Sequence, residues 1–257
     1  KHQPDLLSIK TGASSSGIDL GSLNFNVITK PRVGIFAGEG VSSNNFGEIW
    51  HFFEQQIYYP ISVFNTYDLK SIPFEKLDVL IFPNGSYGFL KSEIPPNAQV
   101  KKETGASTLI KPSPPPKLLD WVRNGGQMIV IGSAMEKFVD QKGYGLVRYE
   151  SETAKKEGKK IAEKEKLNDR NKKYGDRKRN RLIDSAYGSI VKIEMDNSHP
   201  LAFGYDKTYF NLKLEKKLYP LLAKGWNVGI LKDSKSHIAG FMGNRIKKKI
   251  NNNLIFG

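Results

Sequence analysis

Two serines lie where predicted strands end, which is where a nucleophilic hydroxyl is commonly presented. Ser86 occurs in PNGSYG and Ser133 in VIGSAM. Both stretches approach the Gly-x-Ser-x-Gly turn, although Asn84 replaces the first glycine of one and the closing glycine is missing from the other. A serine nucleophile also needs a base, for which His199 and His237 are the candidates. The sequence therefore leaves open a serine-dependent hydrolase that uses Ser133 or Ser86.

His51 and Glu54 form a second pair with possible chemistry. Their HxxE spacing, with His199 far downstream, imitates the ligand pattern of a zinc peptidase. Residues three apart share one face of a helix, but the neighbours Trp50 and Phe52 favour a polar stripe beside an apolar face. We therefore expect no metal or other cofactor in this chain. The absence of cysteine excludes a thiol nucleophile, a disulfide and a cysteine-ligated zinc site.

The loop 38–44 follows the first predicted strand and is the best candidate for a ligand loop. Ligands of open α/β sheets bind beyond the carboxyl ends of the strands, and glycine lets a ligand approach the backbone closely. Glu39 could serve there as an acid or polar handle, or it could cap the loop by accepting backbone N–H groups, which we favour. The candidate ligand residues are Gly38, Glu39, Gly40, Ser42, Ser43 and Asn44.

The elements that would position these residues follow from apolar runs and capping signals. The run 33–37 (VGIFA) predicts a buried parallel strand, and Asn45 with Glu48 predicts a capping box at the start of an amphipathic helix. Further strands are predicted at 61–64, 77–82, 128–131, 189–195, 228–231 and from 253, and helices at 117–124 and 214–224. This order predicts an α/β fold with a three-layer open sheet, mostly parallel and flavodoxin-like.

The domain organisation is predicted from composition. Residues 1–30 are rich in Ser and Gly, which is typical of a linker or an extended lead-in. We expect one α/β domain over 31–257, with insertions at 91–117 and 152–181. Because a strand begins at 253, we also expect the domain to continue beyond Gly257.

The positive charge is concentrated in one segment. The chain has a net charge of +14, and residues 152–181 contribute +7 of it, with 13 Lys and Arg against 6 Asp and Glu. Grooves for nucleic acid interleave cations with aromatics, whereas this segment holds only Tyr174. We therefore expect a solvated, charged helical insertion and no nucleic-acid partner, with a polyanion-binding module through 155–181 as an alternative. No apolar run reaches the roughly 20 residues of a membrane span.

Five stretches together resemble the class I glutamine amidotransferase-like fold. More narrowly, the chain is similar to the domain found C-terminal to the catalytic domain in bacterial zinc carboxypeptidases. The stretches are RVGIFAGEGVSSNNFGEIWHFFEQQIYYPISV (32–63), LDVLIFPNGSY (77–87), LLDWVRNGGQMIVI (118–131), DNSHPLAFGY (196–205) and KGWNVGIL (224–231).

The resemblance implies a function without catalysis in this chain. In a true amidotransferase the matching turn delivers a cysteine, whereas here it reads IGSA with Ser133 at the turn. A hydroxyl is a far weaker nucleophile than a thiolate unless a base activates it. The resemblance therefore implies an accessory domain of an exported zinc metallocarboxypeptidase, with an interdomain or substrate-positioning role. Its partner would be an upstream peptidase domain of the same polypeptide, and the zinc would be held there.

Overall fold

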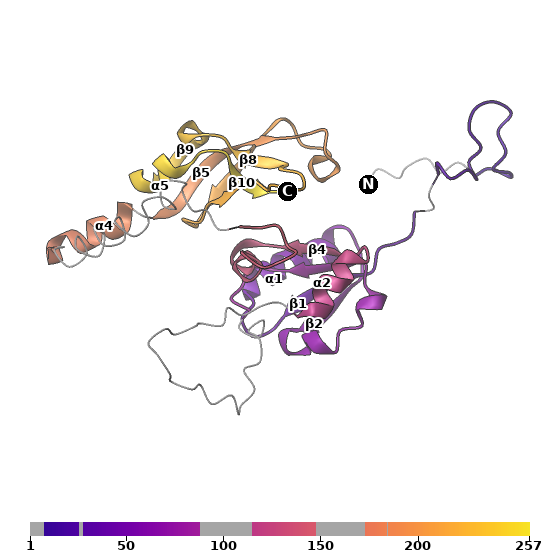
Figure 1. Cartoon of the computed structure of the whole chain (residues 1–257), viewed down its shortest axis with the longest axis horizontal. Coiled ribbons are helices and arrows are strands. Elements are labelled where there is room, and N and C mark those ends of the chain that lie inside the picture. Colours follow the sequence, from indigo (N-terminus) through magenta and orange to yellow (C-terminus); the bar gives the residue numbers. More distant parts are fainter. Residues whose placement is uncertain (1–7, 26–27, 88–114, 148–172, 184) are drawn as a thin grey trace.

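The computed structural model describes residues 8–25, 28–87, 115–147, 173–183 and 185–257 (Figure 1). It shows a mixed α/β protein with a four-stranded parallel sheet and a second, antiparallel sheet. The predicted lead-in contains turns and no helix or strand within residues 8–25 and 28–30. Residues 91–114 of the predicted insertion 91–117 lie outside the described residues. The same is true of residues 152–172 of the predicted insertion 152–181.

The parallel sheet has the strand order β2-β1-β3-β4. All its neighbouring strands pair in parallel, so the four strands predicted in this half of the chain are confirmed. The strands are β1 (Val33–Ala37), β2 (Ile61–Asn65), β3 (Val79–Phe82) and β4 (Gln127–Val130). Between them lie α1 (Ser43–His51), the π-helical turn η1 (Phe52–Gln56), the 3-10 turns η2 (Thr66–Lys70) and η3 (Phe74–Lys76), and α2 (Pro116–Arg123).

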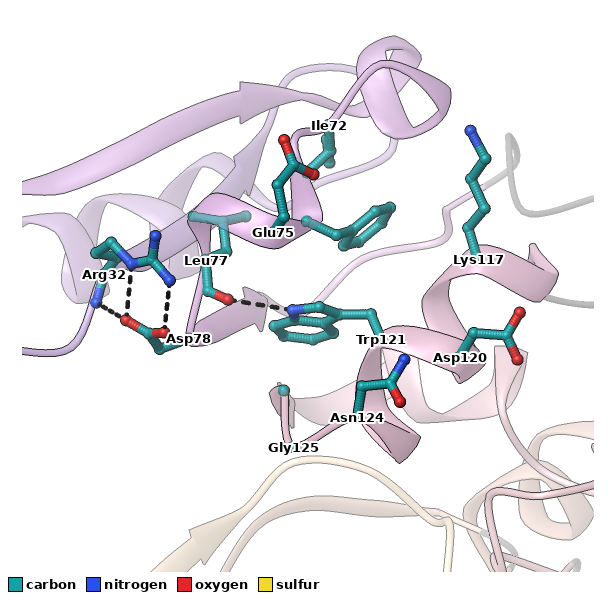
Figure 2. A pocket seen from close by; sticks show the side chains of 12 residues that line it. Arg32, Ile72, Glu75, Leu77, Asp78, Lys117, Asp120, Trp121, Asn124 and Gly125 are labelled. Carbon is teal, nitrogen blue, oxygen red and sulfur yellow. Dashed lines mark hydrogen bonds and ion pairs between the residues drawn. The ribbon is translucent and has the colours of Figure 1, made fainter.

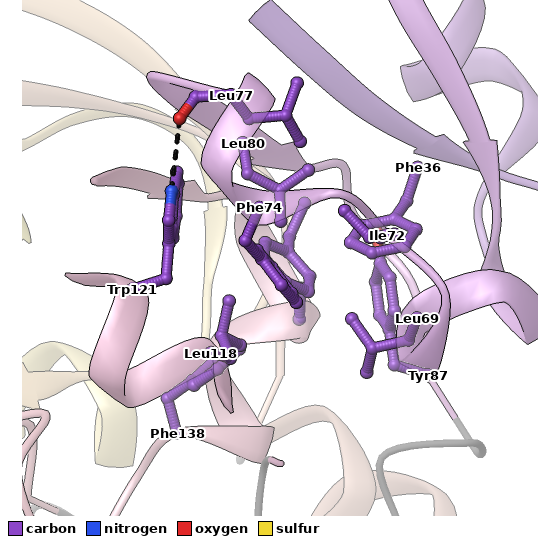
Figure 3. Packing of buried hydrophobic residues seen from close by; sticks show 12 residues of the cluster. Phe36, Leu69, Ile72, Phe74, Leu77, Leu80, Tyr87, Leu118, Trp121 and Phe138 are labelled. Carbon is purple, nitrogen blue, oxygen red and sulfur yellow. Dashed lines mark hydrogen bonds between the residues drawn. The ribbon is translucent and has the colours of Figure 1, made fainter. Parts of the chain in front are cut away.

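Both faces of the parallel sheet are covered, as the unalternating apolar strands predict. On one face Val33, Ile35 and Ile81 pack against Phe46, Ile49 and Phe53 from α1 and η1. On the other face the buried residues of β1 and β3 pack against α2, η2 and η3 (Figure 3). That larger cluster contains Phe36, Leu80, Phe82, Leu69, Ile72, Phe74, Leu118, Trp121 and Phe138.

The start of α1 differs from the predicted capping box. Its N-cap is Ser42, whose hydroxyl accepts a hydrogen bond from the Asn45 backbone N–H. The helix therefore begins earlier than predicted, and the side chain of Asn45 is free to bond elsewhere. The predicted apolar face is also narrower, because Trp50 and Phe52 are exposed.

Helix α2 begins and ends as its sequence predicts. Pro116 occupies its first turn, where the missing N–H costs no intrahelical bond, and Gly125 follows its end with a φ of +100°. The indole N–H of Trp121 donates to the Leu77 carbonyl oxygen over 3.1 Å and ties the helix to the start of β3.

The later strands form a separate sheet, so the predicted α/β class is confirmed, while the predicted parallel pairing is found for β1 to β4 and not for the later strands. They form a six-stranded antiparallel sheet in the order β6-β5-β8-β10-β7, with β9 also paired to β5. The strands are β5 (Ala186–Met195), β6 (Thr208–Lys213), β7 (Tyr219–Pro220), β8 (Gly229–Leu231), β9 (His237–Met242) and β10 (Asn253–Phe256).

Two helices accompany the antiparallel sheet, and a third that was predicted is not formed. Helix α4 (Arg177–Ile183) precedes β5, and α5 (Asn244–Lys249) follows β9. The predicted helix at 214–224 is wrong, because Tyr219–Pro220 is extended and pairs with β10 as β7. Proline lacks the N–H that a helix interior requires. In the part of the chain that the structure describes, no helix is long and apolar enough to cross a membrane.

The two sheets meet through a small apolar cluster. Met135, Val139 and Leu146, which follow β4, pack against Tyr219 of β7, Leu254 of β10 and Leu222, which follows β7. The Tyr219 hydroxyl also donates to Glu136 Oε1 over 2.8 Å.

Candidate functional site at the carboxyl ends of the parallel strands

The loops that follow β1 and β3 are joined by backbone hydrogen bonds. Val41 and Gly85 form an isolated antiparallel bridge. The Ser42 N–H donates to the Asn84 carbonyl over 2.8 Å, and the Ser86 N–H donates to the Gly40 carbonyl over 2.7 Å. The candidate ligand loop is therefore closed onto its neighbour, and these backbone groups are already used.

Asn84 lies at the centre of the polar groups at this sheet edge. Its Oδ1 accepts hydrogen bonds from the Ser133 N–H at 2.8 Å and from the Ser133 hydroxyl at 2.5 Å. The same hydroxyl lies 3.2 Å from the Gly85 carbonyl oxygen. The turn after β4 brings Ser133 here through Gly132, whose φ is +62°. A side chain at position 132 would meet Asn84 Oδ1, because an added Cβ would lie 2.7 Å from it.

The hydrogen-bond chain continues from Asn84 to helix α1. Asn84 Nδ2 donates to Asn45 Oδ1 over 3.1 Å, and Asn45 Nδ2 donates to Glu48 Oε2 over 3.1 Å. Each carboxamide accepts through its oxygen and donates through its nitrogen, so the chain has one direction and ends on a carboxylate. Such a chain aligns its members and strengthens their bonds cooperatively. We call Ser133, Asn84, Asn45 and Glu48 the amide chain.

The amide chain is suited to holding loops and not to activating a nucleophile. A serine becomes nucleophilic when a base takes its proton, and the base must accept the hydroxyl's hydrogen bond. The acceptor of the Ser133 hydroxyl is a carboxamide oxygen, which is not a base at physiological pH. The carboxamides of Asn84 and Asn45 also separate Ser133 from Glu48, which provides the carboxylate of the amide chain.

The other residues of the candidate ligand loop face solvent or support the loop. Glu39 is exposed, and its backbone carbonyl accepts a hydrogen bond of 3.0 Å from the hydroxyl of the buried Thr66. Ser86, Ser43 and Asn44 are exposed, while Gly38 and Gly40 adopt φ values of +97° and +81°. These glycines make the reversal after β1 possible, because left-handed backbone suits glycine.

The structure does not bring the candidate histidines to the serines. His199 Nδ1 accepts the Leu201 N–H over 3.2 Å within the turn after β5, and its ring lies 5.8 Å from that of Trp226. His237 begins β9, where its Nε2 lies 3.2 Å from the Gly240 carbonyl oxygen. His199 and His237 therefore lie among the elements of the antiparallel sheet, whereas Ser86 and Ser133 lie in the turns that follow β3 and β4 of the parallel sheet. Among the described residues, Ser133 is bonded to Asn84 and Gly85 and to no histidine.

The HxxE pair does not form a metal centre within the described residues. His51 ends α1 and Glu54 lies in η1, and both are exposed. The described part of the chain contains no group of three or more His, Asp or Glu side chains that could hold a metal ion.

A hollow of about 610 Å³ lies at the opposite, amino-terminal end of the parallel sheet (Figure 2). Arg32, which precedes β1, makes a two-pronged ion pair with Asp78, with Nε and Nη2 at 3.0 and 2.9 Å from the carboxylate oxygens. These hydrogen bonds hold the pKa of Asp78 at about 2. Trp121, Lys117 and Asp120 line the other side of the hollow, as Figure 2 shows. The ion pair satisfies its own charges, so it joins two strand starts and offers no unpaired cation to a ligand.

Sequence reasoning missed the two asparagines that organise the site. In the sequence, Asn84 stands out only as a departure from a serine motif, and Asn45 only as a helix cap. The position of Asn84 immediately after a buried strand was the available signal, because polar residues at strand ends meet at one sheet edge.

Searches against family models, curated proteins and solved structures found no match to this chain.

Proposed function

We propose that this chain is a non-catalytic α/β module that acts as an accessory domain of a larger exported zinc metallocarboxypeptidase. Its role would be interdomain contact or substrate positioning beside an upstream peptidase domain that carries the zinc. The proposed absence of catalysis is based on one observation: the Ser133 hydroxyl donates its hydrogen bond to the Asn84 carboxamide oxygen. The resemblance of five stretches of the sequence to such accessory domains supports the rest.

The parallel sheet supports the finer fold proposal. Its order β2-β1-β3-β4, with helices packed on both faces, is consistent with a class I glutamine amidotransferase-like, flavodoxin-like half. In that arrangement Ser133 would occupy the turn that delivers the nucleophile in an amidotransferase. A hydroxyl that donates to an amide would stand there in place of the thiol.

Two assays of the purified chain test the absence of catalysis. A fluorophosphonate probe is expected to leave Ser133 and Ser86 unlabelled, because no described base contacts either hydroxyl. Glutamine is expected to remain unhydrolysed, and peptides are expected to keep their C-terminal residue in the presence of zinc. A covalent adduct that disappears in Ser133→Ala would establish the serine-hydrolase alternative, and peptide cleavage abolished by His51→Ala would place metal chemistry in this chain.

The parent assignment is tested by sequencing the reading frame around this chain. We expect an upstream domain with a loop HxxE, a distant third histidine and a leader for export. An upstream region without that ligand set would refute the carboxypeptidase proposal and leave the non-catalytic reading intact.

A further inference from the structure

The solvent face of the antiparallel sheet presents apolar and basic side chains in register. Residues directly opposite each other in antiparallel strands lie on the same face. Tyr187 is opposite Phe241, Ile190 is opposite Leu212, and Lys192 is opposite Phe210. The alternate residues Val191 and Ile193 are buried in the core on the other face. We call this solvent face the platform, and its residues are Tyr187, Ile190, Lys192, Phe210, Leu212 and Phe241.

A bulge in β5 is what places Tyr187 on the platform. Residues an odd number apart point to opposite faces of a regular strand, so Tyr187 and Ile190 would normally diverge. The pairing register with β9 shifts between these two residues, and Gly188 between them has a φ of +74°. Such a glycine bulge re-aims the side chains beside it. Tyr187 and Ile190 are accordingly 65% and 41% exposed on the same face.

Cations of α4 flank the aromatic pair on two sides. Tyr187 borders a hollow of about 510 Å³ that is also lined by Arg181, Lys216, Lys217 and Glu215. Phe241, which is 46% exposed, borders a second hollow of about 450 Å³ lined by Lys178, Arg179 and Asn244. The two aromatics are cross-strand neighbours, so the hollows lie beside one continuous aromatic surface.

We propose that the platform binds single-stranded nucleic acid. Bases would stack on Tyr187 and Phe241, and phosphates would be neutralised by Lys178, Arg179 and Arg181. Exposed aromatics beside a basic groove are the elements from which proteins build such sites, because every base has a face that can stack. Lys192 lies within the platform. A protein partner with an apolar surface would have to bury this charge away from water, whereas a polyanion would pair with it.

The fold removes the reason that sequence analysis gave against this partner. The charged segment 152–181 supplies only one aromatic of its own. Its end, α4, leads directly into β5, and β9 pairs with β5, so Tyr187 and Phe241 lie beside the Arg and Lys side chains of α4. The aromatic side chains that the charged segment lacks are supplied by β5 and β9, so three segments together provide the cations and the aromatics.

Fluorescence anisotropy with a labelled oligothymidylate of about 12 nucleotides tests the proposal. An abasic strand of the same length carries the same charge and is the matched ligand. Tyr187→Ala and Phe241→Ala are each expected to weaken oligothymidylate binding about tenfold and to leave abasic binding unchanged, since only stacking is lost. Tyr187→Phe retains an aromatic ring and is expected to bind as the unmodified chain does.

Tyr209→Ala is the control for loss of an exposed aromatic. Tyr209 is 42% exposed but lies opposite Ile193, on the other face of the sheet. It is expected to bind the oligothymidylate like the unmodified chain. A loss of affinity in this variant equal to that of Tyr187→Ala would overturn the assignment to the platform.

The charge contribution is tested by salt. Lys178→Gln and Arg179→Gln are each expected to reduce the slope of log affinity against log salt by about 0.7. Lys142→Gln, which removes an exposed cation from a turn that follows β4, is expected to leave the slope unchanged. Absence of oligothymidylate binding overturns the proposal. Binding of the abasic strand as tight as that of the oligothymidylate would also overturn the proposal. Heparin that displaces the oligothymidylate, with an affinity independent of Tyr187 and Phe241, would overturn it and indicate an acidic polysaccharide as the ligand.

Discussion

The carboxamide oxygen of Asn84 accepts two hydrogen bonds from Ser133, one from the backbone N–H at 2.8 Å and one from the hydroxyl at 2.5 Å. This contact joins the ends of β3 and β4. Through Asn45 it also extends to the start of α1. The Ser133 hydroxyl at the turn after β4 is thus a structural donor, and the proposed absence of catalysis is based on this hydrogen bond.

Replacing Asn84 is expected to destabilise the sheet edge. Asn84→Ala leaves two donors of Ser133 and the Oδ1 of Asn45 without this partner, so we expect the free energy of unfolding to fall by about 2 kcal/mol. Ser133→Ala removes only the hydroxyl and should cost about 1 kcal/mol. Urea denaturation followed by circular dichroism measures both. Asn197→Ala, in an exposed turn, is the control, with an expected change within about 0.5 kcal/mol. An Asn84→Ala change no larger than that of the control would contradict the role assigned to the amide chain.

The ion pair between Arg32 and Asp78 is expected to contribute stability that acid removes. Its hydrogen bonds lower the pKa of Asp78 to about 2 in the folded chain, against roughly 4 in an unfolded chain. The contribution is therefore present above about pH 4 and is lost as the pH falls towards about 2. Melting temperatures measured across this range should show Asp78→Asn below the unmodified chain at neutral pH and converging with it in acid.

Arg32→Ala provides the control for this pH dependence. The Arg32 backbone N–H also donates to Asp78 Oδ2 over 2.7 Å and is kept in this variant. Once the guanidinium is removed, adding Asp78→Asn should therefore change the melting temperature by an amount that varies less between neutral and acid pH than it does in the unmodified chain. A pH dependence as large as that of the unmodified chain would show that the Arg32 side chain does not lower the pKa of Asp78.

Two glycines are expected to respond to alanine in opposite directions. Gly47 lies inside α1 with open space where a Cβ would be, so Gly47→Ala should raise the free energy of unfolding by about 0.5–1 kcal/mol. An alanine Cβ at Gly85 would lie 2.3 Å from the Gly40 carbonyl oxygen and 2.9 Å from the Tyr87 ring. Gly85→Ala should therefore lower stability by about 1–3 kcal/mol, as overpacking does. Thermal denaturation of the pair measures both signs, and a neutral Gly85→Ala would show that the two loops separate easily.

Two tyrosines with buried hydroxyl groups form a further matched pair. The Tyr144 hydroxyl has no hydrogen-bond partner among the described residues, and burial raises the pKa of Tyr144 to about 12. The Tyr87 hydroxyl donates to the Pro83 carbonyl over 2.8 Å, and burial raises its pKa as well. Tyr144→Phe removes an unsatisfied group and should stabilise the chain by about 1 kcal/mol, whereas Tyr87→Phe should destabilise it by about 1 kcal/mol. Chemical denaturation decides the signs, and a destabilising Tyr144→Phe would reveal a bonded hydroxyl.

Local pattern was sufficient to predict the parallel half of the fold. The runs that became β1, β2, β3 and β4 are apolar without alternation or end in turn residues, and Pro116 and Gly125 mark the limits of α2. These signals depend on neighbouring residues alone, so they can be read without knowing the fold. The helix predicted at 214–224 failed because Pro220 pairs in a strand, and a pairing partner far along the chain is invisible to local pattern.

What the sequence determined by itself was the absence of a thiol, the positive charge and the position of the polar residues at strand ends. Tertiary structure decided which of these residues meet. Parallel pairing brings Asn84 beside Ser133 across 49 residues of sequence, and the histidines go to the other sheet. It also sets Tyr187 opposite Phe241 and beside the cations of α4. The physical reason is that hydrogen bonds and stacking act over a few ångströms, and only strand pairing and helix packing bring segments that are distant in sequence that close.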